Sequence, residues 1–156
     1  MRPTTICVSV AMLFTALPDR PAAQSRPDLT LAVDGATNQT PWVAASGSLV
    51  AVAWAATAAG KADIYTAISR DGGLTFSPPV RVNSVAGKAR VNGELPPRVA
   101  VVPRPGAAEP EIIVVWNAKS DVAQVKIARS RDGGRTFGAP TPLQSAGAEG
   151  ERGTVA

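Results

Sequence analysis

The sequence predicts an all-β protein, and three observations lead to this fold class. Glycine and proline, 14 of each in 156 residues, separate many short apolar runs rich in Ala and Val, which is typical of strands joined by turns. No long segment shows the 3.6-residue apolar period of an amphipathic helix. The chain also contains an internal repeat of a four-stranded unit, and such units in tandem favour the blades of a β-propeller.

The internal repeat defines the organisation of the chain. Residues 41–82 align with residues 97–143, and Trp54 and Trp116 each close an apolar run at matching positions. Self-similarity at a fixed spacing is typical of repeat proteins, in which each repeat is one supersecondary unit. The repeat predicts a first blade at 41–96, a second blade at 97–149 and the start of a truncated third blade at 150–156.

Each repeat is predicted to be a four-stranded meander, because short apolar runs recur at regular spacing between turn signals. The expected strands of the first repeat are Trp42–Ala45, Leu49–Trp54, Ile64–Ser69 and Val80–Asn83. Those of the second repeat are Arg98–Val102, Glu111–Trp116, Val122–Arg129 and a short strand from Phe137 onward. A propeller closes with about four to eight blades, so two blades form an incomplete propeller with unpaired edges. We therefore expect a fragment of a longer protein, with self-association through the open edges as the alternative.

The first residues have the layout of a secretory signal peptide. Arg2 supplies the positive start, residues 6–17 form an apolar run too short to span a bilayer, and residues 21–23 are small enough for cleavage. We assign a signal peptide at 1–23 and a linker at 24–40, and expect a secreted or periplasmic protein of bacterial type without stable membrane insertion. The alternative is a buried N-terminal strand or helix.

The composition excludes several kinds of site. The chain has no histidine, which rules out His-based triads and His-ligated metals, and its one cysteine, Cys7, cannot form a Cys-ligated zinc site. The net charge of +4 comes from scattered residues without a basic block that interleaves with aromatics, so we expect no nucleic-acid partner. No metal and no cofactor are predicted, whereas attraction to an acidic ligand is compatible with the positive charge.

The motif Ser-Arg-Asp-Gly-Gly-x-Thr-Phe occurs twice and can be explained as a hairpin cap. Its acidic side chain can accept hydrogen bonds from backbone N–H groups of the turn. Its glycines permit the positive φ angles of a tight hairpin, and its Phe can cover the turn with apolar surface. The structural residues are Ser69, Asp71, Gly73, Thr75 and Phe76 in the first motif, and Ser130, Asp132, Gly134, Thr136 and Phe137 in the second.

Over about residues 41–143, these two motifs resemble the Asp box, or BNR repeat, of β-propellers in the sialidase superfamily. The resemblance implies a six-bladed propeller in which the boxes are structural and the substrate site lies at the mouth of the central channel. Sialidases bind the sugar carboxylate with an arginine cluster, and use a Tyr–Glu nucleophile pair with an Asp acid/base. The only tyrosine, Tyr65, lies in the strand before the first box, and the Arg-Ile-Pro motif is absent, so no catalytic residue is assigned.

The resemblance leaves three hypotheses of function open. The first is a secreted, sialidase-like propeller fragment that is non-catalytic by itself and whose complete form binds a glycan or another acidic ligand. The second is the N-terminal part of an exo-α-sialidase, a glycoside hydrolase whose nucleophile pair lies in further blades. The third is a scaffold for protein interactions.

Arg98 and Arg152 are the candidate ligand-binding residues, because both stand where the innermost strand of a blade is expected to begin. A guanidinium at the channel mouth could bind a carboxylate bidentately, and Glu94 could join it. The alternative is a surface ion pair, which contributes only about 0–1 kcal/mol. The three tryptophans could stack on sugars, but their strand positions favour a role in the core.

Overall fold

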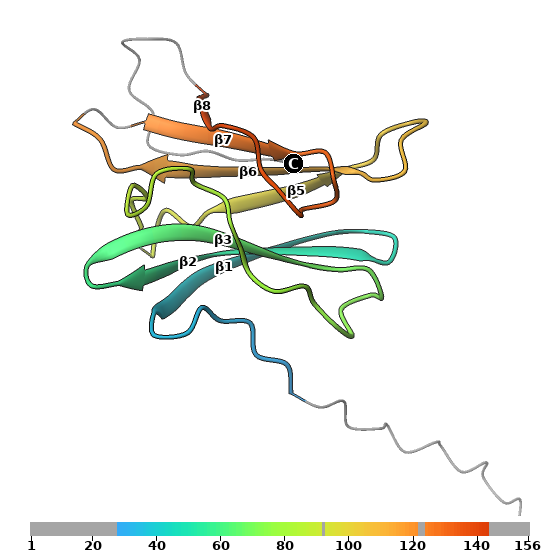
Figure 1. The fold of residues 1–156 in the computed structure, drawn as a ribbon, viewed down its shortest axis with the longest axis horizontal. Helices are drawn as coiled ribbons and strands as arrows, with labels where there is room; N and C mark the ends of the chain where they lie inside the picture. Colours follow the sequence, from blue (N-terminus) through green and yellow to red (C-terminus); the bar gives the residue numbers. More distant parts are fainter. Residues whose placement is uncertain (1–27, 92, 122–123, 144–156) are drawn as a thin grey trace, which may run out of the picture.

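The structure, a computed structural model, describes residues 28–91, 93–121 and 124–143. These residues form eight β-strands and no helix, which confirms the predicted all-β class (Figure 1). The described part of the chain therefore offers no helix with the length and apolar character to cross a membrane. The expected signal peptide at 1–23 and the expected third repeat at 150–156 lie outside the described residues.

The strands form two four-stranded antiparallel sheets, each with its strands in chain order. The first sheet contains β1 (Thr37–Ser46), β2 (Leu49–Ala58), β3 (Lys61–Ser69) and β4 (Val80–Arg81). The second sheet contains β5 (Arg98–Val102), β6 (Glu111–Ala118), β7 (Gln124–Ser130) and β8 (Thr141–Pro142). Both sheets are thus the meanders that the repeat predicts.

The first strand begins earlier than expected, at Thr37 rather than Trp42, within the stretch 24–40 that the sequence assigns to a linker. The pairing of β1 with β2 shifts register between Gln39 and Trp42, and Thr40 has a φ of 52°. The proline that precedes Trp42 has no N–H to donate, so the strand passes it through a bulge. A proline within a run argues against a strand, which is why the sequence pattern places its start too late.

The fourth strand of each sheet is shorter than predicted. β4 ends at Arg81 and not at Asn83, because the Asn83 side chain replaces backbone pairing there: its Oδ1 accepts a hydrogen bond of 2.8 Å from the N–H of Ile64. β8 begins at Thr141 and not directly after Phe137, since the proline before it has no N–H to donate to the sheet.

The last two strands of each sheet match at an offset of 61 residues. In the first sheet β3 pairs with β4 through Thr66 and Val80, and in the second β7 pairs with β8 through Ile127 and Thr141. Backbone hydrogen bonds in the turns after β3 and β7 match in the same way. The repeat seen in the sequence is therefore a repeat of strand register as well.

The sheets pack face to face around one apolar core, with β5 against β1 and β2 (Figure 1). The strand β2 contributes a row of small residues to this core, and β6 contributes larger ones. Small side chains opposite large ones allow the two layers to interdigitate at the density of protein interiors. The small row is Ala51, Ala53 and Ala55, and the large row is Ile112, Val114 and Trp116.

The opposite face of the first sheet carries a second apolar cluster, which consists of Val52, Trp54, Ala56 and Ala67. The segment before β1 packs against this cluster and is tied to it by Asn38. The Asn38 Oδ1 accepts hydrogen bonds from Nε1 of Trp54 and from the N–H of Val33, both at 2.9 Å. Both faces of the first sheet are therefore apolar and covered.

Candidate functional site

The first Asp box closes the turn after β3 by hydrogen bonds within itself. Asp71 Oδ1 accepts from the N–H groups of Leu74 (3.0 Å) and Thr75 (2.9 Å), and its Oδ2 accepts from the Thr75 hydroxyl at 2.6 Å. The buried Ser69 hydroxyl donates to Asp71 at 2.7 Å and accepts from the N–H of Gly73 at 2.8 Å. Asp71 thus accepts hydrogen bonds from two N–H groups and two hydroxyls of its own turn.

The second box repeats this arrangement. Asp132 Oδ1 accepts from the N–H groups of Arg135 and Thr136, both at 3.0 Å. The hydroxyls of Ser130 and Thr136 donate to the same carboxylate at 2.6 Å and 2.5 Å. The N–H of Gly134 donates to Ser130 Oγ at 2.8 Å, so the second serine also has a double role.

Both carboxylates are held in the ionised form by their own turns. Hydrogen bonds from Thr75 and Ser69 hold the pKa of Asp71 well below its usual range. At Asp132, desolvation raises the pKa, but the bonds from Ser130 and its neighbours outweigh this effect and the net shift is downward. Within the described ranges, no group of three or more Asp, Glu, His or Cys could hold a metal ion. The hydrogen bonds of both carboxylates stay within their own turns.

The structure places Arg98 at the start of β5, where its guanidinium lies over an aromatic ring. Arg98 Cζ is 3.5 Å from the centre of the Trp42 ring in β1, which makes a cation–π contact between the two sheets. Glu94 is exposed in the loop before β5, and Arg152 lies outside the described residues. The predicted carboxylate-binding residue thus already has a partner on one face of its guanidinium.

The three tryptophans do not share one role. Trp54 and Trp116 are core residues, each 3% exposed, as their strand positions predict. Trp42 is 37% exposed, so the expectation of a core role is wrong for this residue. Its ring is instead available to the Arg98 guanidinium because β1 and β5 lie side by side.

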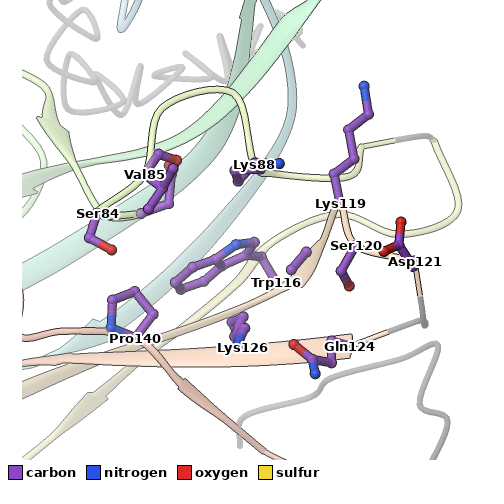
Figure 2. A pocket seen from close by; sticks show the side chains of 12 residues that line it. Ser84, Val85, Lys88, Trp116, Lys119, Ser120, Asp121, Gln124, Lys126 and Pro140 are labelled. Atoms are coloured by element: carbon purple, nitrogen blue, oxygen red, sulfur yellow. The ribbon is translucent and has the colours of Figure 1, made fainter.

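A cleft of about 720 Å³ lies between the loop after β4 and the β6–β7 hairpin (Figure 2). In an antiparallel meander, this hairpin and the turn after β7 lie at opposite ends, so the cleft is at the end away from the Asp boxes. Three lysines and one aspartate line it, which leaves a net charge of +2. We call it the lysine cleft, after Lys88, Lys119 and Lys126.

Backbone pairing brings two of these lysines together from different parts of the chain. An antiparallel bridge joins Ala89 to Ala118, and next to it the N–H of Lys119 donates to the carbonyl of Lys88 at 2.8 Å. The N–H of Ala89 also donates to the carbonyl of Ala62 in β3 at 3.1 Å. The connection between the sheets is therefore hydrogen-bonded to both, which fixes the wall of the cleft.

The loop after β4 is organised by a buried asparagine. Asn83 Nδ2 donates to Asp63 Oδ1 at 2.6 Å and to the carbonyl of Val85 at 2.7 Å. The N–H of Gly87 donates to the same Asp63 oxygen at 2.6 Å. These bonds hold residues 83–87 in one conformation, and this loop carries the side chains that form one side of the lysine cleft.

Trp116 lies in the middle of the cleft lining. It is the cross-strand partner of Lys126. Figure 2 shows its indole between Val85 and Lys88 on one side and Lys126 on the other. Trp116 is only 3% exposed, so its ring supports the wall of the cleft, and the ammonium groups of the lysines can attract an anionic group.

The lysines of the cleft are absent from the candidate residues that the sequence yields. They are widely spaced in the chain and belong to no motif, and only the pairing of the two sheets brings them together. Two features of the sequence are signals for such a binding site: the net charge of +4 and the possibility that a tryptophan stacks on a sugar. Neither signal identifies particular lysines.

Comparisons of the chain with protein-family models, with curated proteins and with solved structures find no match. Three features of the molecule bear on its function: the paired Asp boxes, the packing of the two sheets and the lysine cleft. The lysine cleft gathers four charged side chains around a hollow large enough for a small ligand.

Proposed function

We propose that the chain is a secreted, non-catalytic binding module of the sialidase-like Asp-box propeller type, and that the lysine cleft binds a carboxylated sugar. The observation that carries this proposal is the cleft of about 720 Å³ that Lys88, Lys119 and Lys126 line. Ammonium groups donate charge-assisted hydrogen bonds to a carboxylate, such as that of an acidic sugar.

The size and polarity of the lysine cleft support a ligand of this class. Its volume of about 720 Å³ lies within the range of about 300–1,000 Å³ that is usual for small-molecule pockets. Ser84, Ser120 and Gln124 line it together with the lysines. Hydroxyl and amide groups both donate and accept hydrogen bonds, as the hydroxyls of a sugar do.

Several features support binding rather than hydrolysis. A sialidase-type nucleophile is a tyrosine activated by a glutamate, but Tyr65 packs on Trp54, with ring centres 6.3 Å apart, away from the core between the sheets. Asp71 and Asp132 are occupied by the hydrogen bonds of their own turns. The chain has no histidine that could act as a general base.

The packing of the sheets supports the propeller as the parent architecture. The first strands of the two sheets, β1 and β5, lie against each other, as the innermost strands of neighbouring blades do. Each sheet has four antiparallel strands in chain order, which is the make-up of a blade. If the complete protein follows the family that its motifs resemble, it contains six such units.

Calorimetric titration with sialyllactose and with lactose tests the proposed binding. The first sugar carries a carboxylate that the second lacks, so we expect the chain to bind sialyllactose more tightly, and less tightly as salt is added. Replacing two lysines, Lys88→Gln and Lys126→Gln, is expected to weaken binding about tenfold or more, since each hydrogen bond to a charged group contributes about 1.5–3 kcal/mol.

The matched control is Lys61→Gln, which removes an exposed lysine that does not line the cleft and is expected to leave the affinity unchanged. Equal affinity for both sugars, or an unchanged affinity in the double variant, would contradict the assignment of the site. The same preparation should release no fluorophore from a fluorogenic sialoside, and measurable release would contradict the non-catalytic role.

A further inference from the structure

We infer that the end of β7 carries a docking site for the first Asp box of a second copy of this chain. The site is a hollow of about 450 Å³, lined by Ile127, Arg129, Arg131, Gly138, Ala139 and Thr141. We call it the β7 hollow. It lies at the Asp-box end of the second sheet, away from the lysine cleft, and the inference does not depend on the proposed sugar binding.

The molecule already contains one example of this contact. The second Asp box docks on the end of β3 in the first sheet, where Gly134 lies so close to Ile68 that an added Cβ would overlap its side chain. Arg70, the residue after β3, donates from Nη2 to the carbonyl of Gly133 at 3.0 Å. A turn of the second sheet is thus held by an isoleucine and an arginine of the first.

Charge reinforces this internal contact. Arg70 and Arg135 share the carboxylate of Glu109, with N–O distances of 3.3 Å and 3.1 Å. Arg135 occupies the variable position of the second box, so that position lies beside the arginine of the neighbouring sheet. The same variable position in the first box is Leu74, whose side chain is exposed.

The β7 hollow is the counterpart of the occupied surface on the first sheet. At the offset of 61 residues, Ile68 corresponds to Arg129 and Arg70 corresponds to Arg131. The strand pairing and turn hydrogen bonds around both surfaces match, so their backbones have the same layout. Arg131 pairs with Glu111 through Nε at 3.4 Å, but its side chain stays 76% exposed, which leaves its other nitrogens to donate to a docked turn.

The first Asp box is the matching ligand. Its glycines, Gly72 and Gly73, have φ angles of 72° and 91°, close to the 69° and 87° of Gly133 and Gly134. An added Cβ at either glycine of the first box would meet no atom within 4 Å, whereas both glycines of the second box are buried against the first sheet. The described residues therefore include both surfaces of the proposed contact: the first Asp box on the first sheet and the β7 hollow on the second sheet.

A contact of this kind joins two different surfaces, so it is heterologous and propagates from copy to copy into rings or open chains. The backbone carbonyl of Gly72 would accept a hydrogen bond from Arg131 of the next copy. Leu74 of the docked box would lie beside the same guanidinium. These two positions allow the contact to be tested by charge.

Analytical ultracentrifugation of the 156-residue chain over a wide concentration range tests the inference. We expect reversible, concentration-dependent association of the unaltered chain. Leu74→Arg places a third cation beside Arg129 and Arg131, which already share the one carboxylate of Glu111, and is expected to weaken association about tenfold or more. Arg131→Glu is expected to weaken it as well, and the double variant, which pairs the new arginine with the new glutamate, is expected to restore it.

The control is Arg81→Glu, which makes the same charge change on an exposed residue outside both surfaces. Circular dichroism checks that each variant keeps its sheets, and Leu74→Arg alters only an exposed side chain, so it gives a result even if Arg131→Glu fails to fold. A chain that stays monomeric at every concentration overturns the inference and leaves the hollow to a further repeat unit of a longer chain. Association that is unchanged in both Leu74→Arg and Arg131→Glu overturns the inference too.

Discussion

At the scale of single residues, the Asp boxes show how a short motif can satisfy itself. Each carboxylate accepts hydrogen bonds from two N–H groups and two hydroxyls, and each serine is buried between its aspartate and a glycine N–H. Such bonds favour the charged carboxylate over the neutral acid. The stability of the turns should therefore depend on pH.

The pH dependence follows from the direction of the pKa shifts. The folded pKa of Asp71 and Asp132 is lowered, whereas in the unfolded chain it is near the ordinary value of about 3.9. Their stabilisation is therefore complete above that value and is lost as the pH falls through the folded pKa. We expect the melting temperature to fall on acidification below about pH 4, and to fall less in the double variant Asp71→Asn, Asp132→Asn.

Thermal unfolding by circular dichroism at a series of pH values measures this difference. Asp34→Asn serves as the control, because it removes an exposed aspartate outside both boxes. Parallel pH curves for the wild type and the double variant would show that the boxes do not contribute a titrating stabilisation.

Part of this detail could be predicted from the sequence. The role of Asp71 follows from local chemistry, because a short acid in a glycine turn finds N–H groups within reach whatever the rest of the fold does. The contact of Arg98 with Trp42 could not be predicted, since it depends on how two sheets approach each other. For the same reason, the sequence suggests that Arg98 binds the carboxylate of a ligand, whereas in the structure its guanidinium stacks on the ring of Trp42.

At the scale of the strands, a comparison of the two repeats shows one position where a buried polar residue corresponds to an apolar one. Thr66 in β3 is completely buried, and its hydroxyl has no hydrogen-bond partner among the described residues. The equivalent residue of the second sheet is Ile127, which has no polar atom in its side chain. A buried hydroxyl without a partner destabilises the fold.

Thr66→Val should therefore stabilise the chain. The substitution keeps the β-branched shape and removes the unpaired hydroxyl, so we expect the free energy of unfolding to rise by about 1 kcal/mol. Urea denaturation measures this change, with Thr57→Val, at a partly exposed site in β2, as the control. A loss of stability on Thr66→Val would mean that the hydroxyl has a partner in the folded chain.

The strands themselves were largely predictable, and their ends were not. Short apolar runs between turn signals locate β2, β5 and β6, and the apolar residues of β3 lie directly before the turn motif. The end of β4 is set by the Asn83 side chain, and the start of β1 by a bulge at Thr40, neither of which has a periodic signal. The lysine cleft escaped prediction because it combines the loop after β4 with the β6–β7 hairpin of the other sheet.

At the scale of the whole molecule, the central claim is that the two sheets are equivalent units stacked in one direction. The face that the first sheet turns toward the second is rich in alanine, and the second box is held at its edge by Arg70 and Ile68. The lysine cleft and the Asp boxes lie at opposite ends of this stack. Ligand binding and association between copies can therefore occur on the same molecule.

The most direct test of this claim compares Gly134→Ala with Gly73→Ala by chemical denaturation. Both glycines have positive φ, so each substitution costs about 1–2 kcal/mol of backbone strain. Only at Gly134 does the new methyl group meet the first sheet, at Ile68, and such overpacking costs about 1–3 kcal/mol more. We predict that Gly134→Ala destabilises the chain by this additional amount. Equal losses for the two substitutions would contradict the docking of the second box on the first sheet.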